Sequence, residues 1–255
     1  MSPSASPRRR TGATRPAKLG SFRIGTSGWQ YDHWVGPFYP EGLPKSDWLE
    51  YYARYFDTVE VNNTFYHLPR ASTFDSWRIR AAEGFCYALK FSRFGSHLKR
   101  LIDPEDTIGL FLERADRLAK HLGPILVQLP PRWDADPDRL ARFLDVAPSR
   151  HRWALEFRDP SWLSDTVFTV LRDHNAALCI HDLILDHPRE LTADWTCLRF
   201  HGPRGSGSYS HQALAAQADH IREYLSRGLD TFAYFNNDAH GYAPANAAEL
   251  KRLLA

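Results

Sequence analysis

The chain has 255 residues, of which 43% are hydrophobic and 24% charged, a balance typical of a folded globular protein rather than a disordered one. It contains no apolar run near the roughly 18 residues that a membrane helix needs, which argues against a membrane protein. Since the whole chain carries +2 and residues 1–20 contribute +5, the remaining residues carry −3. Residues 21–255 are thus not strongly basic, as a protein that binds the phosphate backbone of a nucleic acid would be. The net charge therefore does not support a nucleic-acid partner.

The first 20 residues differ from the rest in composition, because they contain Ser, Pro, Ala and Arg but no acidic residue. They lack the apolar segment of a secretory signal, and we expect a disordered basic tail over residues 1–20, although this composition also has some transit-peptide character. No linker interrupts residues 21–255, which predicts one domain. Three cysteines lie in apolar runs without metal-ligand spacing, which predicts core residues in a reducing, cytoplasmic compartment: Cys86, Cys179 and Cys197.

From residue 22 onward, short β-rich runs alternate with longer amphipathic runs, which is the pattern of βα units and a parallel sheet. The predicted strands are residues 22–25, 58–62, 87–91, 125–129, 153–157, 177–181, 196–201 and 231–236. The predicted helices are residues 47–56, 72–82, 104–122, 137–146, 166–174, 211–227 and 245–254. Eight strands favour a (β/α)8 TIM-type barrel with one degenerate βα unit at residues 182–195, which are too few for a helix and two loops. An open doubly wound sheet is the alternative.

Charged and amide side chains interrupt these strands near their carboxyl ends, where a strand buried on both faces should be almost continuously apolar. Residues two apart on a strand share one face, so side chains from most of the strands converge. Because barrels build their sites at this end, we predict a polar pocket there. A salt-bridge network that only ties the strands together, for example Glu156 with Arg199, is the structural alternative. The polar residues concerned are Glu60, Asn62, Lys90, Gln128, Glu156, Arg158, His181, Arg199, His201, Asn236 and Asp238.

Aromatic residues in the loops that follow the strands form a second candidate feature, and they include Trp29, Phe65, Tyr66 and Tyr209. Such rings either line a pocket wall that stacks on a planar ligand or pack to close the barrel mouth.

Short motifs recur at these strand ends, and they are Gly25-Thr26-Ser27-Gly28-Trp29, Thr58-Val59-Glu60-Val61-Asn62, Lys90-Phe91, Val127-Gln128-Leu129-Pro130-Pro131, Glu156-Phe157-Arg158, Arg199-Phe200-His201-Gly202 and Tyr234-Phe235-Asn236-Asn237-Asp238. Together they resemble the YecE-like family, also called domain of unknown function 72 (DUF72). The resemblance covers residues 24–243, nearly the whole predicted domain, and its motifs occur in the same order. It implies a TIM-type barrel, in agreement with the strand count, and it implies no activity because the family's biochemical role is not established.

The first functional hypothesis is a barrel that binds or acts on a small molecule bearing a phosphate or carboxylate. If it is an enzyme, acid/base chemistry of a hydrolase, lyase or isomerase is the expected class. Cationic and polar side chains would hold the ligand: Lys90, Arg158, Arg199, Gln128, Asn62, Asn236, Asp238, Trp29 and Tyr66. The candidate general acids and bases are Glu156, Glu60, His201 and His181.

Two alternatives stay open. One is metal-assisted phosphodiester or nucleic-acid hydrolysis, by fold-level analogy with endonuclease IV. It would draw its ligands from Glu156, His181, Asp182, His201 and Asp238. Lys90, Arg158 and Arg199 in the same ring would repel a divalent ion, so a metal is disfavoured and no cofactor is predicted. The other alternative is a barrel that binds a ligand without catalysis.

Overall fold

The computed structural model describes residues 18–203 and 207–255. The predicted tail, residues 1–20, lies outside the described residues except for residues 18–20. All eight predicted strands are present, with ends that agree to within three residues. They are β1 (Phe22–Thr26), β2 (Thr58–Val61), β3 (Cys86–Lys90), β4 (Leu122–Gln128), β5 (Trp153–Glu156), β6 (Ala177–His181), β7 (Trp195–Phe200) and β8 (Asp230–Phe235).

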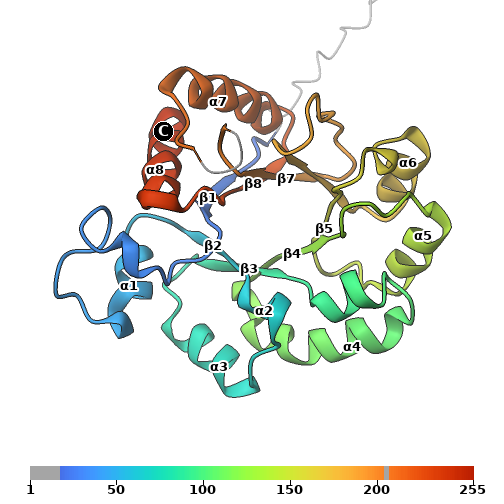
Figure 1. The fold of residues 1–255 in the computed structure, drawn as a ribbon, viewed down its shortest axis with the longest axis horizontal. Helices are drawn as coiled ribbons and strands as arrows, with labels where there is room; N and C mark the ends of the chain where they lie inside the picture. The colour runs from blue at the N-terminus through green and yellow to red at the C-terminus, as the bar shows by residue number, and fades with distance from the viewer. Residues whose placement is uncertain (1–17, 204–206) are drawn as a thin grey trace, which may run out of the picture.

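The strands form one parallel sheet in the order β1-β8-β7-β6-β5-β4-β3-β2. The two end strands meet through a single bridge between Ser27 and Glu60, supported by a hydrogen bond of 2.8 Å from Gly28 N to Glu60 O. The sheet is therefore a nearly closed barrel surrounded by helices (Figure 1). An open doubly wound sheet is excluded, because each strand pairs with its neighbour in the chain and β1 pairs with β8.

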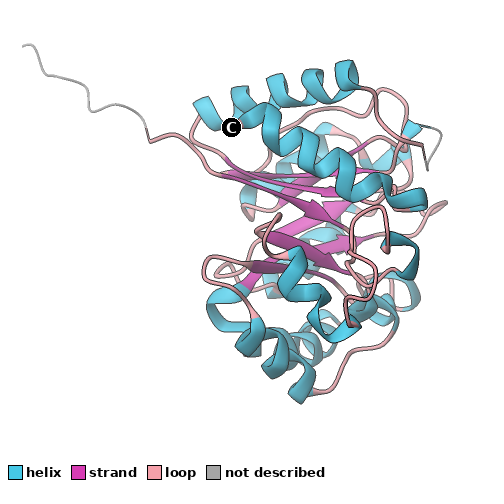
Figure 2. Ribbon diagram, turned by 90° about the vertical axis from the view of Figure 1, so that its left-hand side faces the viewer, coloured by secondary structure: helices cyan, strands magenta, loops and turns pink. Residues whose placement is uncertain are grey.

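Helices cover the outside of the barrel (Figures 1 and 2). They are α1 (Trp48–Tyr52), α2 (Asn63–Tyr66), α3 (Ala71–Arg80), α4 (Pro104–Ala115), α5 (Pro137–Val146), α6 (Asp165–Asp173), α7 (His211–Ser226) and α8 (Tyr242–Leu254). Short 3₁₀ or π turns lie at Asp32–Trp34, Lys45–Asp47, Phe94–Leu98, Asp116–His121, Pro160–Trp162 and Ala239–Gly241.

Local sequence explains where these helices begin and end. At α5, Asp136 accepts a hydrogen bond of 3.0 Å from Arg139 N, and a proline at the first position has no amide to leave unpaired. The helix predicted over residues 104–122 is shorter, because the chain turns at Ala119 (φ 49°) before β4 begins. Residues 182–194, between β6 and β7, contain no helix, which confirms the degenerate unit. No helix in the described ranges is long and apolar enough to cross a membrane.

The barrel interior and the layer between strands and helices form two separate cores. The larger core fills the space between the sheet and the surrounding helices. The interior core contains several small residues, which leaves room for long polar side chains toward the carboxyl ends of the strands. Its members are Cys86, Ala88, Leu126, Ala154, Ala177, Cys179, Trp195, Cys197, Phe232 and Tyr234. All three cysteines are buried and unpaired, as their apolar surroundings predict.

Candidate functional site

Polar side chains at the strand ends face the barrel interior, because most of them lie two residues beyond a member of the interior core. Lys90 follows Ala88, Glu156 follows Ala154, and Arg199 follows Cys197 on the same face. Six of the polar residues are at most 9% exposed: Glu60, Lys90, Glu156, His181, Arg199 and His201. The structure therefore brings them together at one end of the barrel.

Arg199 lies at the centre of this group and contacts two carboxylates. Its Nη1 lies 2.5 Å from Glu156 Oε2, and its Nη2 lies 2.7 Å from Glu60 Oε1. Although burial alone would raise the pKa of Glu156, the guanidinium groups of Arg199 and Arg158 hold that pKa well below its usual range. We predicted from the sequence that Arg199 contacts a ligand. In the structure its side chain is 1% exposed, and both of its Nη atoms form ion pairs with the two glutamates. Arg199 therefore organises the floor of the site.

Arg158 lies nearer the surface than Arg199, with 21% of its side chain exposed. Its Nε donates to Glu156 Oε1 at 2.5 Å, and its Nη2 lies 3.4 Å from Gln128 Oε1. The same Nη2 lies 3.4 Å from Nε2 of His201. Protein acceptors therefore hold the guanidinium of Arg158 in place, while part of its side chain stays accessible to solvent.

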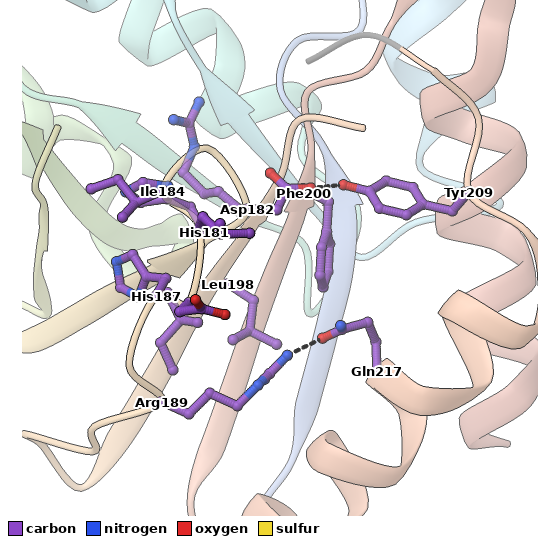
Figure 3. Close-up of a pocket in the computed structure, with 13 residues that line it drawn as sticks. His181, Asp182, Ile184, His187, Arg189, Leu198, Phe200, Tyr209 and Gln217 are labelled. Carbon is purple, nitrogen blue, oxygen red and sulfur yellow. Dashed lines mark hydrogen bonds between the residues drawn. The ribbon is translucent and has the colours of Figure 1, made fainter. Parts of the chain in front are cut away.

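His201 is oriented by the carboxylate of Asp182. Oδ1 of Asp182 lies 3.2 Å from His201 Nδ1 and accepts from the His201 backbone amide at 2.9 Å. Tyr209 donates its hydroxyl hydrogen to the other oxygen, Oδ2 (Figure 3). Burial would raise the pKa of Asp182, but the hydrogen bonds from His201 and Tyr209 lower it overall. A proton on Nδ1 of His201 satisfies Asp182 and leaves a lone pair on Nε2.

Lys90 has a different environment from the two arginines. Its Nζ lies 4.3 Å from the centre of the Phe65 ring, and no carboxylate of the described residues lies within 4 Å of it. The side chain is 9% exposed. Burial, with repulsion from Arg199, lowers the pKa of Lys90 from 10.5 to about 8. Thr64 places α2 over this lysine by donating to the Lys90 carbonyl at 2.7 Å, which brings Phe65 against the ammonium.

His181 does not have the free nitrogen that a general acid or base needs. Its Nε2 lies 2.7 Å from the Phe157 carbonyl, and its Nδ1 accepts from the Leu183 amide at 3.2 Å. Burial lowers the pKa of His181 to about 4, so the ring is neutral at pH 7. The predicted acid/base role of this residue is therefore replaced by a structural one, in which it joins β5 to the β6–β7 connection.

Other predicted site residues lie around the rim or below it. Trp29 is 5% exposed and packs edge-on against Trp77 at 6.1 Å, so it belongs to the core rather than to a pocket wall. Tyr66 is 67% exposed at the rim. Asn62 and Asn236 are half-buried, and their side chains make no hydrogen bond to the described residues. The Asp238 carbonyl accepts a hydrogen bond of 3.3 Å from Trp34.

Sequence reasoning missed the contacts of three residues that shape the site. Asp182 was considered only as a metal ligand, and Tyr209 and Phe65 only as loop aromatics. The partners of Asp182 lie 19 and 27 residues away in the chain, so spacing carries no signal for them. For Phe65, its position three residues beyond Asn62 could have indicated the contact. The one-turn helix α2 begins directly after Asn62 and places Phe65 over the barrel mouth.

Carboxylates and imidazoles of the described ranges do not gather as a metal-ligand cluster, since no group of three or more has suitable geometry. The two buried glutamates instead face Arg199 and Arg158 at ion-pair distance. Guanidinium groups contact both oxygens of Glu156 and one oxygen of Glu60, while Glu60 Oε2 has no hydrogen-bond partner among the described residues.

Comparison with known proteins gives several relatives of this chain, of which three are described. The UPF0759 protein YunF of Bacillus subtilis is 25% identical over 268 residues, covering 91% of this chain and 94% of that protein. The UPF0759 protein YecE of Escherichia coli K12 is 32% identical over 142 residues, covering 55% of this chain and only half of that protein. A DUF72 family protein from Thermotoga maritima has a solved structure with a TM-score of 0.81 and 26% identity, over 92% of this chain and 99% of that one.

The family model described as "Protein of unknown function DUF72" matches residues 23–255, which include all of the barrel strands except the first residue of β1. The chain therefore belongs to the DUF72 family.

Proposed function

We propose that this barrel binds a small molecule bearing a phosphate or carboxylate group at the carboxyl ends of its strands, with Lys90 as the charged contact. The observation that carries the proposal is the environment of Lys90. Its ammonium is almost buried, lies over the Phe65 ring at 4.3 Å and has no carboxylate within 4 Å among the described residues. Burial of an unpaired charge is costly, and an anionic ligand would offset that cost.

The neighbouring ion pairs support a ligand of limited charge. Arg199 is shared by Glu60 and Glu156, and Arg158 is shared by Glu156 and Gln128. Because these carboxylates already balance the two arginines, the net positive charge available to a ligand comes mainly from Lys90 and the exposed part of Arg158. A single phosphate or carboxylate group suits this charge better than a polyphosphate does.

The pairing of His201 with Asp182 supports proton transfer at the same end of the barrel. With Nδ1 of His201 donating to Asp182, the lone pair of Nε2 lies 3.4 Å from Nη2 of Arg158 and 3.4 Å from Nη1 of Arg199, so a substrate proton would reach it in place of these long contacts. This is the arrangement of a general base that is oriented by a carboxylate. We therefore favour an acid/base enzyme over a barrel that only binds, and assign the base to His201 rather than to the paired glutamates.

Binding of inorganic phosphate and of acetate, measured by titration calorimetry, tests the proposal. We expect the Lys90→Met variant to bind about 10- to 100-fold more weakly than the natural chain, the range expected for loss of one charge-assisted contact. Lys99→Met is the matched control, because Lys99 is exposed and paired with Asp103 at 2.7 Å. Equal affinity in the natural chain and Lys90→Met, or no binding of either anion, would contradict the proposal.

A further inference from the structure

A cavity lies on the outer side of β6 and β7, where the barrel lacks a covering helix. It has a volume of about 290 Å³, is partly open to solvent, and is lined by β6, β7, their connection and the helix α7 (Figure 3). Its lining does not include Lys90, and Ile180 and Leu198 on its floor point away from the barrel interior that Cys179 faces. At one end it borders residues already described at the barrel mouth, which are His181, Asp182, Arg199 and Tyr209. Its size lies at the lower end of the range for small-molecule pockets.

The floor of this cavity is apolar. Ile180 projects from β6, and Leu198 and Phe200 project from β7, while Ile184 and Leu185 approach from the connection. Leu185 is 89% exposed, an unusual environment for a large apolar residue beside a cavity. In the other units of a (β/α)8 barrel, a helix would cover the same face of the strands. An apolar ligand body would bury this surface.

One end of the cavity carries a guanidinium without a carboxylate partner. Arg189 Nη2 donates to Gln217 Oε1 at 2.6 Å, and Nη1 donates to the Tyr224 hydroxyl at 3.2 Å. Within the described ranges no carboxylate lies within 4 Å of Arg189, and its chain neighbour Glu190 is paired with Arg172 instead. Arg189 and Gln217 lie at the end opposite Asp182 and Tyr209 (Figure 3).

A second polar group on the cavity lining is His187, whose Nε2 is buried and has no hydrogen-bond partner among the described residues. Its Nδ1 lies 2.9 Å from the Pro188 carbonyl, so a proton on Nδ1 leaves Nε2 as an acceptor. A buried acceptor without a partner is costly, and a donor on a ligand or a water molecule would supply the missing hydrogen bond. An ionised carboxylate has no hydrogen to donate, so His187 is not the group that would hold it.

We propose that this cavity binds a small carboxylic acid with an apolar body. The carboxylate would lie on Arg189, which offers the fork of donors that such a group accepts. The body would lie on Ile180, Leu198 and Phe200. One arginine beside an apolar floor matches a ligand with one negative charge. A strongly hydrated polyanion would not bury the apolar side chains of that floor. The proposal does not depend on Lys90 or on the function proposed above.

Octanoate and 1-octanol provide a test, because the two probes share an alkyl chain and differ in charge. By titration calorimetry we expect the natural chain to bind octanoate more tightly than 1-octanol. We expect Arg189→Leu to weaken octanoate binding by about 10- to 100-fold and to leave 1-octanol binding unchanged. Arg222→Leu is the control, since Arg222 lies on α7 but is exposed and paired with Asp219. Arg189→Gln replaces Arg189→Leu if the latter does not fold.

Methyl NMR of Ile180 and Leu198 gives the location independently, because both methyl signals should shift when octanoate binds. Three results would overturn the proposal: no octanoate binding by the natural chain at millimolar concentration, equal octanoate affinity in Arg189→Leu, or shifts confined to methyl groups outside the cavity. Loss of phosphate binding in Lys90→Met has no bearing on these results, so the two proposals fail separately.

Discussion

Nη1 of Arg199 lies 2.5 Å from Oε2 of Glu156, and both side chains are withdrawn from solvent inside the barrel. The other nitrogen of the guanidinium reaches Glu60, so one cation joins β7 to β5 and to β2. Removal of this cation would leave two carboxylates buried without their partner, which costs far more than loss of a surface ion pair.

The Arg199→Met variant should therefore be strongly destabilised. We expect its free energy of unfolding to fall by about 3–5 kcal/mol, the range for breaking a buried ion pair from one side. Urea unfolding followed by circular dichroism measures the change. The matched control is Arg222→Met on the exposed face of α7, which should shift stability by less than about 0.5 kcal/mol. Equal decreases in the free energy of unfolding of the two variants would show that the ion pairs of Arg199 with Glu60 and Glu156 stabilise the fold no more than a surface ion pair does.

Lys90→Met should have the opposite effect on stability. Burial and Arg199 lower the pKa of Lys90 from 10.5 to about 8, so the folded chain bears a cost for keeping this lysine charged at pH 7. Met keeps the alkyl volume and removes the charge, and we expect the free energy of unfolding to rise by about 1–2 kcal/mol. In the natural chain, stability should rise between about pH 8 and 10.5, because the unfolded chain holds the Lys90 proton longer. Destabilisation at pH 7 in Lys90→Met would contradict this account.

His181 should make stability depend on pH in the acid range. Its pKa is about 4 in the folded chain and 6.5 in the unfolded chain, so the unfolded chain binds the proton first as the pH falls. The stability that His181 contributes is therefore present above about pH 6.5 and is lost progressively toward pH 4. His181→Gln should show a shallower decline over this interval in urea unfolding at stepped pH. An unchanged slope would mean that His181 does not titrate as described.

Tyr209→Phe should raise the pKa of Asp182, because it removes the hydroxyl that donates to Oδ2. The carboxyl carbon of Asp182 reports this pKa directly in ¹³C NMR. Tyr55→Phe is a suitable control, since Tyr55 is exposed and its hydroxyl lies 3.1 Å from Tyr51. If the pKa of Asp182 is the same in Tyr209→Phe and in the natural chain, the Tyr209 hydroxyl does not stabilise the Asp182 carboxylate beside His201.

Much of the fold could be predicted from the sequence because strands and helices leave local signals. The run at residues 177–181 coincides with β6, and the residues two apart at the strand ends do share the interior face. These are consequences of a repeat of two along each strand, which needs no knowledge of the tertiary structure. The absence of a helix over residues 182–194 followed from length alone.

The contacts of the site could not be predicted in the same way. Alternation places Arg199 and Glu156 in the interior, but it does not decide whether Arg199 faces a ligand or two carboxylates. Similarly, the sequence does not show that both nitrogens of His181 are occupied, since one partner is the backbone of Phe157 on a neighbouring strand. Such outcomes depend on strand stagger and side-chain rotamers, which only the folded chain determines.

The single bridge between Ser27 and Glu60 gives the barrel a weak seam. Every other pair of neighbouring strands shares two or more registered residues, while a single bridge from Ser27, just beyond β1, pairs this edge with β2. Glu60 lies on that seam and is also the residue that Arg199 holds from the far wall. The barrel is therefore a rolled sheet with a weakly paired edge, and the Arg199 side chain links that edge to the opposite side of the interior. Amide protons along β2 should exchange with deuterated solvent before those in β7. Loss of the Arg199–Glu60 ion pair would let the barrel open between β1 and β2.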